Sequence, residues 1–220
     1  MLDKKLKSDV IEAYVKLFED YAETSDIEKV YDDTVKYAQR IDLDDITEED
    51  VENVIKPFLY KWGNMGRVLG RQEYKGWEKK LKDLIKEYSS MLGNFRKESL
   101  AKIEKFEREI KEIYSKFRET LGPIAAGKTL NILCPNFFPL WDSAIRNAFS
   151  QAFDLKDDDY YTFMLKVRNF IKEYEETFSK LANKYNKNML RIFDEFSWQI
   201  THDPISLFPN VFAISSVSNV

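Results

Sequence analysis

The sequence contains very little of the chemistry from which disulfides, metal sites and histidine-based catalysis are built. Its 220 residues include one cysteine, Cys134, and one histidine, His202. A lone cysteine cannot form an internal disulfide and agrees with a reducing compartment. The same two counts exclude a cysteine-built zinc site and any triad or metal cluster that requires two imidazoles. We therefore expect neither a bound metal nor a cofactor.

Glycine, proline and long apolar runs are also scarce. Seven glycines and six prolines, together with 44% hydrophobic and 33% charged residues, are typical of a soluble, helix-rich globular protein. The apolar runs are too short to span a bilayer. The first ten residues, MLDKKLKSDV, lack the apolar block and the small-residue cleavage site of a secretory signal. These absences predict a cytoplasmic protein that does not interact with a membrane.

Apolar residues recur at three- and four-residue intervals along most of the chain, which is the pattern of amphipathic helices. Residues 160–178, for example, carry this pattern as one long helix. No strand pattern competes with it, apart from a weak one at residues 207–217. The sequence therefore predicts an all-α fold, a compact bundle of about nine helices. It predicts one domain over residues 1–220, in which residues 1–56 can stand apart as an acidic N-terminal subdomain and residues 201–220 as a C-terminal arm.

A few residues predict where helices begin, bend or stop. Ser25 and Glu28 have the spacing of a capping box at a helix start. Pro57 lies within an apolar helical pattern and predicts a kink or a break in a helix that otherwise continues. Gly93 and Asn94 interrupt a later helical pattern and predict a break at that point.

Charge is unevenly distributed, although the net charge of the chain is only −4. Residues 1–56 carry 8 lysines and arginines against 17 acidic residues, residues 57–128 carry 17 against 10, and residues 129–220 carry 9 against 11. The three segments therefore have net charges of −9, +7 and −2. The basic middle third permits binding to DNA, because local lysines and arginines displace the counterions of phosphates. Long solvated helices with charged outer faces are the alternative explanation.

One short segment carries a pattern that is typical of nucleotide binding. Residues 122–129, GPIAAGKT, satisfy Gly-x-x-x-x-Gly-Lys-Thr, in which backbone N–H groups wrap phosphates and the lysine, here Lys128, reaches the terminal ones. Such a loop joins the end of a buried strand to a helix. The residues before Gly122 are charged and helical in period instead. A chance occurrence of the pattern is therefore the better interpretation, and a nucleotide site stays as a third hypothesis.

The same segment also reads as a helical hairpin followed by a further helix. It consists of a tight turn at Gly122 and Pro123, a short helix over residues 125–133, the irregular link PNFFP, and a new helix that begins near Trp141. In this order of elements, residues 121–142 remotely resemble the helix-hairpin-helix DNA glycosylase superfamily. In that superfamily a lysine lies on the second helix of the hairpin, and an aspartate begins the helix that follows.

The resemblance places Lys128 and Asp142 in these two positions. Residues 138–142, FPLWD, are similar to the apolar-Pro-apolar-Asp entry of the superfamily. When Lys128 is aligned, Ile124 and Ala126 stand where the hairpin of the superfamily has glycines. A closer resemblance, carried by WGNMGR and by the run from Lys-Thr-Leu to Trp-Asp, is to a group of uncharacterised archaeal and bacterial proteins, and it implies no activity.

The glycosylase resemblance implies a catalytic pair. A desolvated Lys128 would attack the sugar carbon and form a Schiff base, while Asp142 would take up a proton or stabilise the positive charge that develops as the base leaves. Aromatic side chains would stack on a flipped base, and arginines would hold phosphates. The predicted substrate-binding residues are Trp141, Phe137, Phe138, Arg146 and Arg67.

Each of these residues also has an ordinary alternative: Asp142 as a helix N-cap, Lys128 as an exposed helix lysine, and the aromatic rings as core. The first hypothesis is therefore a DNA-binding protein that resembles a base-excision DNA glycosylase or lyase, with DNA bound through the basic middle third. The second is a noncatalytic helical interaction protein. The sequence does not identify any protein partner.

Overall fold

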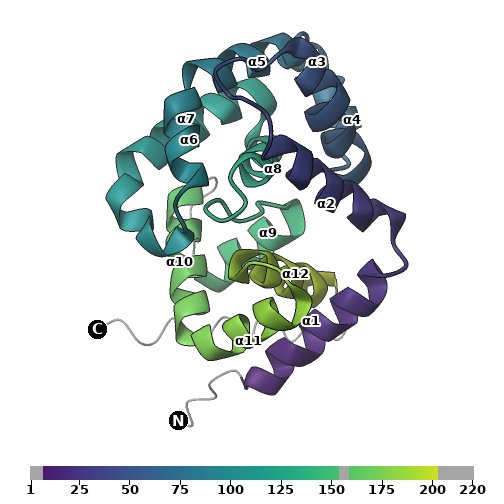
Figure 1. The fold of residues 1–220 in the computed structure, drawn as a ribbon, viewed down its shortest axis with the longest axis vertical. Helices are drawn as coiled ribbons and strands as arrows, with labels where there is room; N and C mark the ends of the chain where they lie inside the picture. Colours follow the sequence, from purple (N-terminus) through teal and green to yellow (C-terminus); the bar gives the residue numbers. More distant parts are fainter. Residues whose placement is uncertain (1–6, 154–158, 203–220) are drawn as a thin grey trace. The chain divides into compact units, whose positions relative to one another are not determined.

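The computed structural model describes residues 7–153 and 159–202, and every regular element in these two stretches is helical. The all-α prediction is therefore confirmed for the described residues. Judged by length and hydropathy, no described helix qualifies as a membrane span. The α-helices drawn in Figure 1 are α1 (Ser8–Ala22), α2 (Asp26–Ala38), α3 (Glu48–Asp50), α4 (Gly66–Leu69), α5 (Trp77–Glu87), α6 (Ser89–Arg96), α7 (Glu107–Leu121), α8 (Pro123–Leu133), α9 (Ser143–Phe153), α10 (Tyr160–Glu173), α11 (Glu175–Tyr185) and α12 (Met189–His202). Two π-helices, η1 (Val51–Ile55) and η2 (Phe58–Trp62), and two 3-10 helices, η3 (Gln72–Tyr74) and η4 (Leu100–Phe106), accompany them.

The chain divides into two compact units. Unit 1 comprises residues 1–24 and 142–220, and unit 2 comprises residues 25–141. The boundary after residue 24 lies inside the acidic segment 1–56, which contributes α1 to unit 1 and α2 and α3 to unit 2. Of the C-terminal arm predicted at 201–220, the first two residues end α12, and residues 203–220 lie outside the described residues, as does the weak strand pattern within them.

Unit 2 is built around α8, which packs against α7, α2 and η2. All nine residues from Ala125 to Leu133 are buried. A helix enclosed on every side is expected to be apolar all round, yet α8 carries three polar side chains, Lys128, Thr129 and Asn131. The fold of unit 2 therefore brings a lysine into its interior.

The link after α8 completes the core of unit 2 with aromatic rings. Phe137 stacks on Phe95 with ring centroids 4.6 Å apart and planes 22° apart. Phe106 and Phe138 each make an edge-to-face contact with the Phe137 ring, with ring centroids 5.7 Å and 5.1 Å apart respectively. Such ring pairs add stability beyond the area they bury. They fix the chain where it leaves α8.

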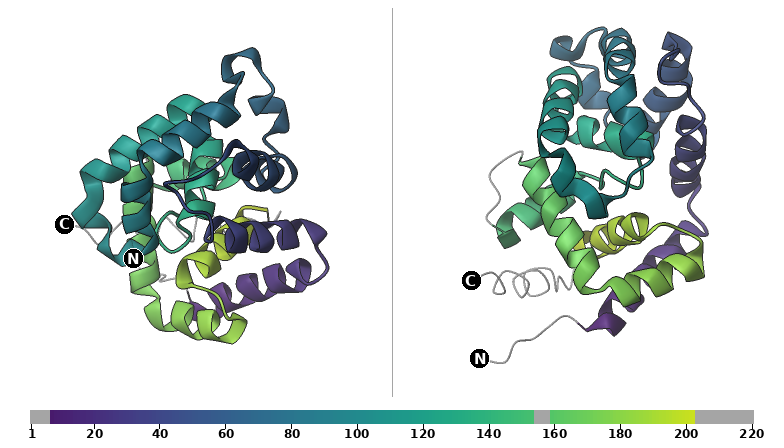
Figure 2. Two further views of the ribbon diagram at one scale, coloured as in Figure 1. Left: turned by 45° about the horizontal axis from the view of Figure 1, so that its top comes forward. Right: turned by 60° about the vertical axis from the view of Figure 1, so that its left-hand side comes forward.

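Unit 1 has a comparable centre in α12, which contacts α1, α9, α10 and α11. The purple α1 and the yellow-green α12 lie side by side in Figures 1 and 2. Eight consecutive residues of α12, from Leu190 to Ser197, are buried. Phe196 stacks on Phe170 of α10 at 5.8 Å and 15°. This helix also carries charged residues into a core.

The twelve α-helices of the described residues exceed the predicted nine, mainly because two predicted helices are divided. Residues 160–178 form α10 and α11, separated by Tyr174 with φ −114° and ψ 30°, and α5 and α6 are separated in the same way by Tyr88. Both tyrosines still donate their N–H groups to the carbonyl four residues earlier. The apolar pattern therefore runs through each bend without a break. The predicted break at Gly93 and Asn94 is wrong, since both residues lie within α6.

At Pro57 the helical path continues, as the sequence predicts, but it widens. The π-helices η1 and η2 lie on either side of the proline, and the N–H of Gly63 bonds to the carbonyl of Phe58 at 2.8 Å, five residues earlier. A proline removes one helical hydrogen bond and crowds the carbonyl four residues before it. Wider turns are one way to accommodate this crowding.

Gly122, the only residue between α7 and α8, provides a test of this fold. Its φ of 77° and ψ of 166° lie in a region that residues with a Cβ atom avoid, and an added Cβ would lie 2.8 Å from the Tyr74 hydroxyl. We expect Gly122→Ala to lower the free energy of unfolding by about 2 kcal/mol or more. Gly93→Ala in α6 is the matched control, since an added Cβ there meets nothing within 4 Å and should stabilise the helix by about 0.5–1 kcal/mol. Denaturant unfolding of both variants measures the difference, and equal effects would contradict this account of the α7–α8 junction.

Candidate functional site

Lys128 lies on the enclosed helix α8, and its side chain is 4% exposed. Its ammonium group donates a hydrogen bond to the backbone carbonyl of Gly63 at 3.1 Å. The same nitrogen lies 5.1 Å from the centroid of the Trp62 ring, a cation–π distance. Both partners belong to the C-terminal end of η2, where carbonyl groups lack helical partners. The prediction of an exposed helix lysine is therefore wrong, and the prediction of a desolvated one holds.

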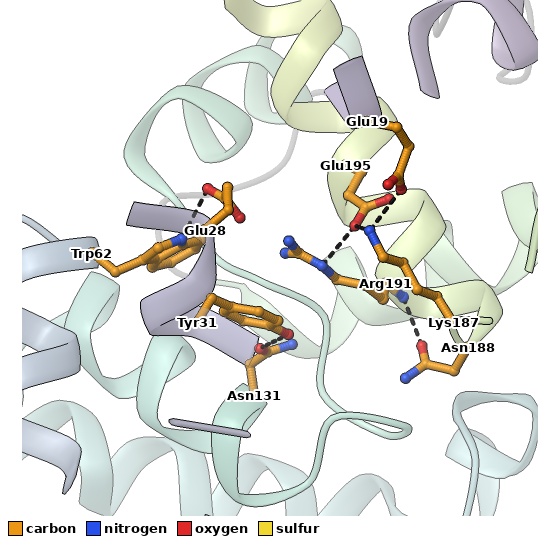
Figure 3. A network of polar contacts seen from close by, with 9 residues as sticks. All are labelled: Glu19, Glu28, Tyr31, Trp62, Asn131, Lys187, Asn188, Arg191 and Glu195. Atoms are coloured by element: carbon orange, nitrogen blue, oxygen red, sulfur yellow. Dashed lines mark hydrogen bonds and ion pairs between the residues drawn. The ribbon is translucent and has the colours of Figure 1, made fainter. Parts of the chain in front are cut away.

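Trp62 is held by unit 2 from several directions. Its indole N–H donates to the Glu28 carboxylate at 3.0 Å (Figure 3). Its ring stacks on Phe58 at 5.1 Å and 15°. The Tyr31 ring lies 5.2 Å from it at 40°. Because the ring can neither slide nor turn without losing a contact, the surface beside the amine is fixed. Glu28 follows Ser25, whose side chain accepts the Glu28 N–H at 3.4 Å, so the predicted cap at Ser25 is confirmed while the Glu28 side chain bonds to Trp62.

One turn further along α8, Asn131 makes a second polar connection. The Tyr31 hydroxyl donates to the Asn131 side-chain oxygen at 2.9 Å (Figure 3). The Asn131 side-chain NH2 group donates to the carbonyl of Phe138 at 2.8 Å. The orientation of the amide is thereby settled by both partners. We refer to the following residues together as the Lys128 cluster: Glu28, Tyr31, Trp62, Gly63, Lys128 and Asn131.

The segment GPIAAGKT does not form a phosphate loop. Residues 123–129 belong to α8, and the helix α7, not a strand, ends directly before Gly122. The N–H of Ala126 bonds to the carbonyl of Gly122 at 3.0 Å, and the Thr129 hydroxyl donates to Ala125 at 2.8 Å. These donors are used within the helix. The match to the nucleotide-binding pattern is therefore one of letters only.

Asp142 begins unit 1 and acts as the N-cap of α9. Its side chain accepts the N–H of Ala144 at 2.8 Å, and its carbonyl accepts the N–H of Arg146 at 2.8 Å. The predicted capping role is thereby confirmed. Lys128 belongs to unit 2, so the meeting of the Lys128 amine and the Asp142 carboxylate stays a prediction.

The three aromatic residues predicted to stack on a base are buried in the structure. Phe137 and Phe138 are fully buried, and Trp141 is 1% exposed. The Cβ atom of Trp141 lies 2.5 Å from where a Cβ on Gly127 would be, so Gly127 is needed for the close approach of this residue to α8. Packed neighbours cover these side chains, which agrees with the core alternative, and stacking on a flipped base stays a prediction.

The remaining predicted substrate-binding residues are two arginines. Arg67 is exposed on α4, and Arg146 is partly exposed on α9 in unit 1. Cys134 is fully buried, which raises the pKa of its thiol to about 12, and this fits a core group rather than a nucleophile. Within residues 7–153 and 159–202, no three His, Cys, Asp or Glu side chains are grouped so that they could hold a metal ion.

A second buried polar cluster lies in unit 1. Lys187 donates to Glu19 at 2.6 Å and to Glu195 at 2.7 Å, and Arg191 lies 2.8 Å from Glu195 (Figure 3). Glu195 is fully buried, and its second oxygen has no hydrogen-bond partner. Burial raises the pKa of this carboxyl to about 7, and Glu19 adds to the rise, although Arg191 and Lys187 oppose it. This cluster is not among the residues predicted from the sequence, where the i,i+4 spacing of Arg191 and Glu195 was the available signal.

The raised pKa of Glu195 predicts a pH-dependent stability. A folded-state pKa above the unfolded value means that the stabilisation is present at acidic pH and is lost as pH rises through about 7. We expect the free energy of unfolding of the wild type to fall between pH 5 and pH 8, relative to that of Glu195→Gln, by at most about 1.4 kcal/mol per pH unit. Denaturant unfolding at several pH values measures the slope. Glu12→Gln, which removes the accessible pair with Lys180, is the control; equal slopes for the wild type and Glu195→Gln would contradict the role given to burial.

Comparison with known proteins gives no match: no family model, no curated protein and no solved structure is significantly similar to this chain. The functional argument therefore depends on the chemistry of the residues described above. Of these, the Lys128 cluster combines a buried amine with an aromatic plane and a fixed carbonyl group.

Proposed function

We propose that the protein acts on DNA as a base-excision glycosylase or lyase, with Lys128 as its nucleophile. The observation that carries the proposal is the burial of the Lys128 amine on the helix that directly follows the α7–Gly122 junction. The order of elements also supports it: two helices joined at one glycine, a lysine on the second, an irregular link, and Asp142 at the start of the next helix.

The proposed reaction requires an unprotonated amine. Lys128 would lose a proton and attack C1′ of the sugar, forming a C–N bond as the bond from C1′ to the base breaks and the base takes up a proton. Loss of a second proton from nitrogen, followed by cleavage of the C1′–O4′ bond with protonation of O4′, would give a protonated Schiff base. The carboxylate of Asp142 would accept a proton or stabilise the positive charge on the sugar.

The alternative function is that of a noncatalytic helical interaction protein. The contacts of Lys128 also favour it, because an ammonium group that binds the free carbonyl at the end of η2 stabilises that end of the helix. The two functions differ in whether the amine reacts. They can therefore be separated by variants that keep the charge and the packing but change the chemistry.

Borohydride trapping on a DNA duplex with an abasic site tests the nucleophile. We expect the wild type to form a covalent adduct and Lys128→Arg to form at least about 100-fold less of it. A guanidinium keeps the charge and the hydrogen bond but forms no Schiff base. Lys116→Arg, at an exposed lysine of α7 paired with Glu119, should trap like the wild type. Equal trapping by Lys128→Arg and the wild type would sink the proposal. Absence of any adduct with the wild type would favour the alternative.

Two substitutions of Asp142 separate capping from chemistry. Asp142→Asn keeps an oxygen that can accept the N–H of Ala144, so its melting temperature should stay close to that of the wild type. Asp142→Ala removes the cap and should cost about 1 kcal/mol. If the carboxylate takes part in proton transfer, both variants lower the trapping rate by about 100-fold, although only Asp142→Ala loses the cap. An unchanged rate would show that Asp142 is only a cap.

A further inference from the structure

Residues 61–75 of unit 2, which we call the basic corner, carry four basic residues and one acidic residue, a net charge of +3. The basic side chains are all exposed: Lys61, Arg67, Arg71 and Lys75. Arg71 lies 3.9 Å from the exposed Glu73, whereas Lys61, Arg67 and Lys75 have no carboxylate within 4 Å among the described residues. The positive charge of the corner is therefore largely uncompensated.

Three lysines further along unit 2 each have an acidic partner. Lys102 lies 2.6 Å from Glu98, Lys111 lies 2.5 Å from Glu107, and Lys116 lies 3.3 Å from Glu119, all within one helical turn. In each pair the negative charge of the glutamate offsets the positive charge of the lysine. The +7 charge of the middle third therefore includes paired lysines as well as the corner, where three of the four basic side chains have no carboxylate within 4 Å among the described residues.

The corner is attached to α8 at two points. At its start, the carbonyl of Gly63 accepts the hydrogen bond of Lys128, and near its end the Tyr74 hydroxyl lies 2.8 Å from where a Cβ on Gly122 would be. Gly122 and Lys128 are six residues apart, which is about 9 Å along a helix. The chain that carries Arg67 and Arg71 runs between these two points, so the corner follows the first half of α8.

The backbone of the corner is compact. A Cβ on Gly63 would lie 2.7 Å from the carbonyl oxygen of Leu59, and one on Gly70 would lie 3.0 Å from that of Gly66. Asn64 has a φ of 52°, a conformation that favours asparagine or glycine. These tight turns hold the basic side chains outward on a defined backbone.

The chemistry of the corner favours phosphates over a protein surface. Its larger aliphatic side chains, Met65 and Leu69, are 8% and 2% exposed, and the partly exposed Trp62 is held by Glu28 and Phe58. Stable protein interfaces need buried aromatic or aliphatic anchors at their centre. Exposed arginines and lysines without such anchors are what a phosphate backbone requires.

We infer that the basic corner binds the phosphate backbone of a nucleic acid next to Lys128. This inference rests on the proposed function, because it takes DNA as the substrate whose sugar Lys128 attacks. It adds the surface that holds the strand, and it connects that surface to the amine through Gly63.

The test compares two triple variants with the same loss of charge. Lys61→Gln, Arg67→Gln and Lys75→Gln together neutralise the corner, and Lys102→Gln, Lys111→Gln and Lys116→Gln together form the control. Fluorescence anisotropy with a labelled duplex that contains an uncleavable abasic-site analogue gives Kd over a salt series. We expect the Kd of the corner variant to rise at least about tenfold, and the Kd of the control to stay within about twofold of the wild type. The corner variant should also show a shallower dependence of log Kd on log salt concentration, by the amount expected for the loss of about three phosphate contacts.

Three outcomes would overturn the inference: equal weakening by both triples, no weakening by the corner triple, or binding of polyglutamate as tight as that of DNA with the same dependence on the corner. Borohydride trapping of each variant at saturating protein keeps the two proposals apart. If the wild type is trapped and both triple variants have equal Kd values, the proposal for Lys128 as the nucleophile is supported and the proposal for the basic corner is rejected. Corner-dependent binding of DNA without any adduct supports the corner and removes the nucleophile.

Discussion

The enclosure of α8 is the constraint on which unit 2 depends. No residue from Ala125 to Leu133 faces solvent, and a buried polar group costs free energy unless it is paired. Each polar side chain of the helix therefore has a fixed partner within the unit: Lys128 at the end of η2, Asn131 at Tyr31 and Thr129 on its own backbone. The C-terminal carbonyls of α8 are satisfied from outside the helix, at Ile132 and Leu133 by Gln39 and at Leu133 also by Arg96. These bonds fix α2, α6 and η2 around α8, so the polar groups of the buried helix specify the arrangement that its apolar residues stabilise.

The central helix of unit 1 meets the same constraint with charges. On α12 the buried Glu195 shares Arg191 and Lys187, and Lys187 also binds Glu19. An ion pair in a core gains Coulomb energy but loses the hydration of both partners, and the balance is often near zero. The raised pKa of Glu195 indicates that for this carboxylate the loss of hydration is the larger effect. In unit 2 the Lys128 ammonium donates to a backbone carbonyl and lies at a cation–π distance from an aromatic ring.

Residue spacing predicts much of this fold and little of the site. The apolar period finds the helices because it reports which face is buried, and it misses the bends at Tyr88 and Tyr174 because the period continues through them. Lys128 is identified from its place after the glycine turn. The partners of Lys128 are not identified from the sequence. Trp62 lies 66 residues before Lys128, and Glu28, which accepts the indole N–H of Trp62, lies 34 residues before that tryptophan. Long-range pairs of this kind depend on how helices pack, which periodicity along one helix does not encode. The burial of Phe137 and Phe138 was available as an alternative, but nothing local distinguishes a ring that packs from one that stacks on a base.

The burial of Lys128 also limits how it can act. An amine that is 4% exposed meets a sugar only when part of its cover moves, and the cover includes the Trp62–Gly63 turn at the start of the basic corner. A strand held by the corner would pull on the same backbone whose carbonyl holds the amine. Under the two proposals, binding of phosphate and release of the Lys128 amine are therefore mechanically connected through Gly63. Both events involve the same short turn. It carries the cations proposed to bind phosphate, and it supplies the Gly63 carbonyl that the Lys128 amine must leave before it can react.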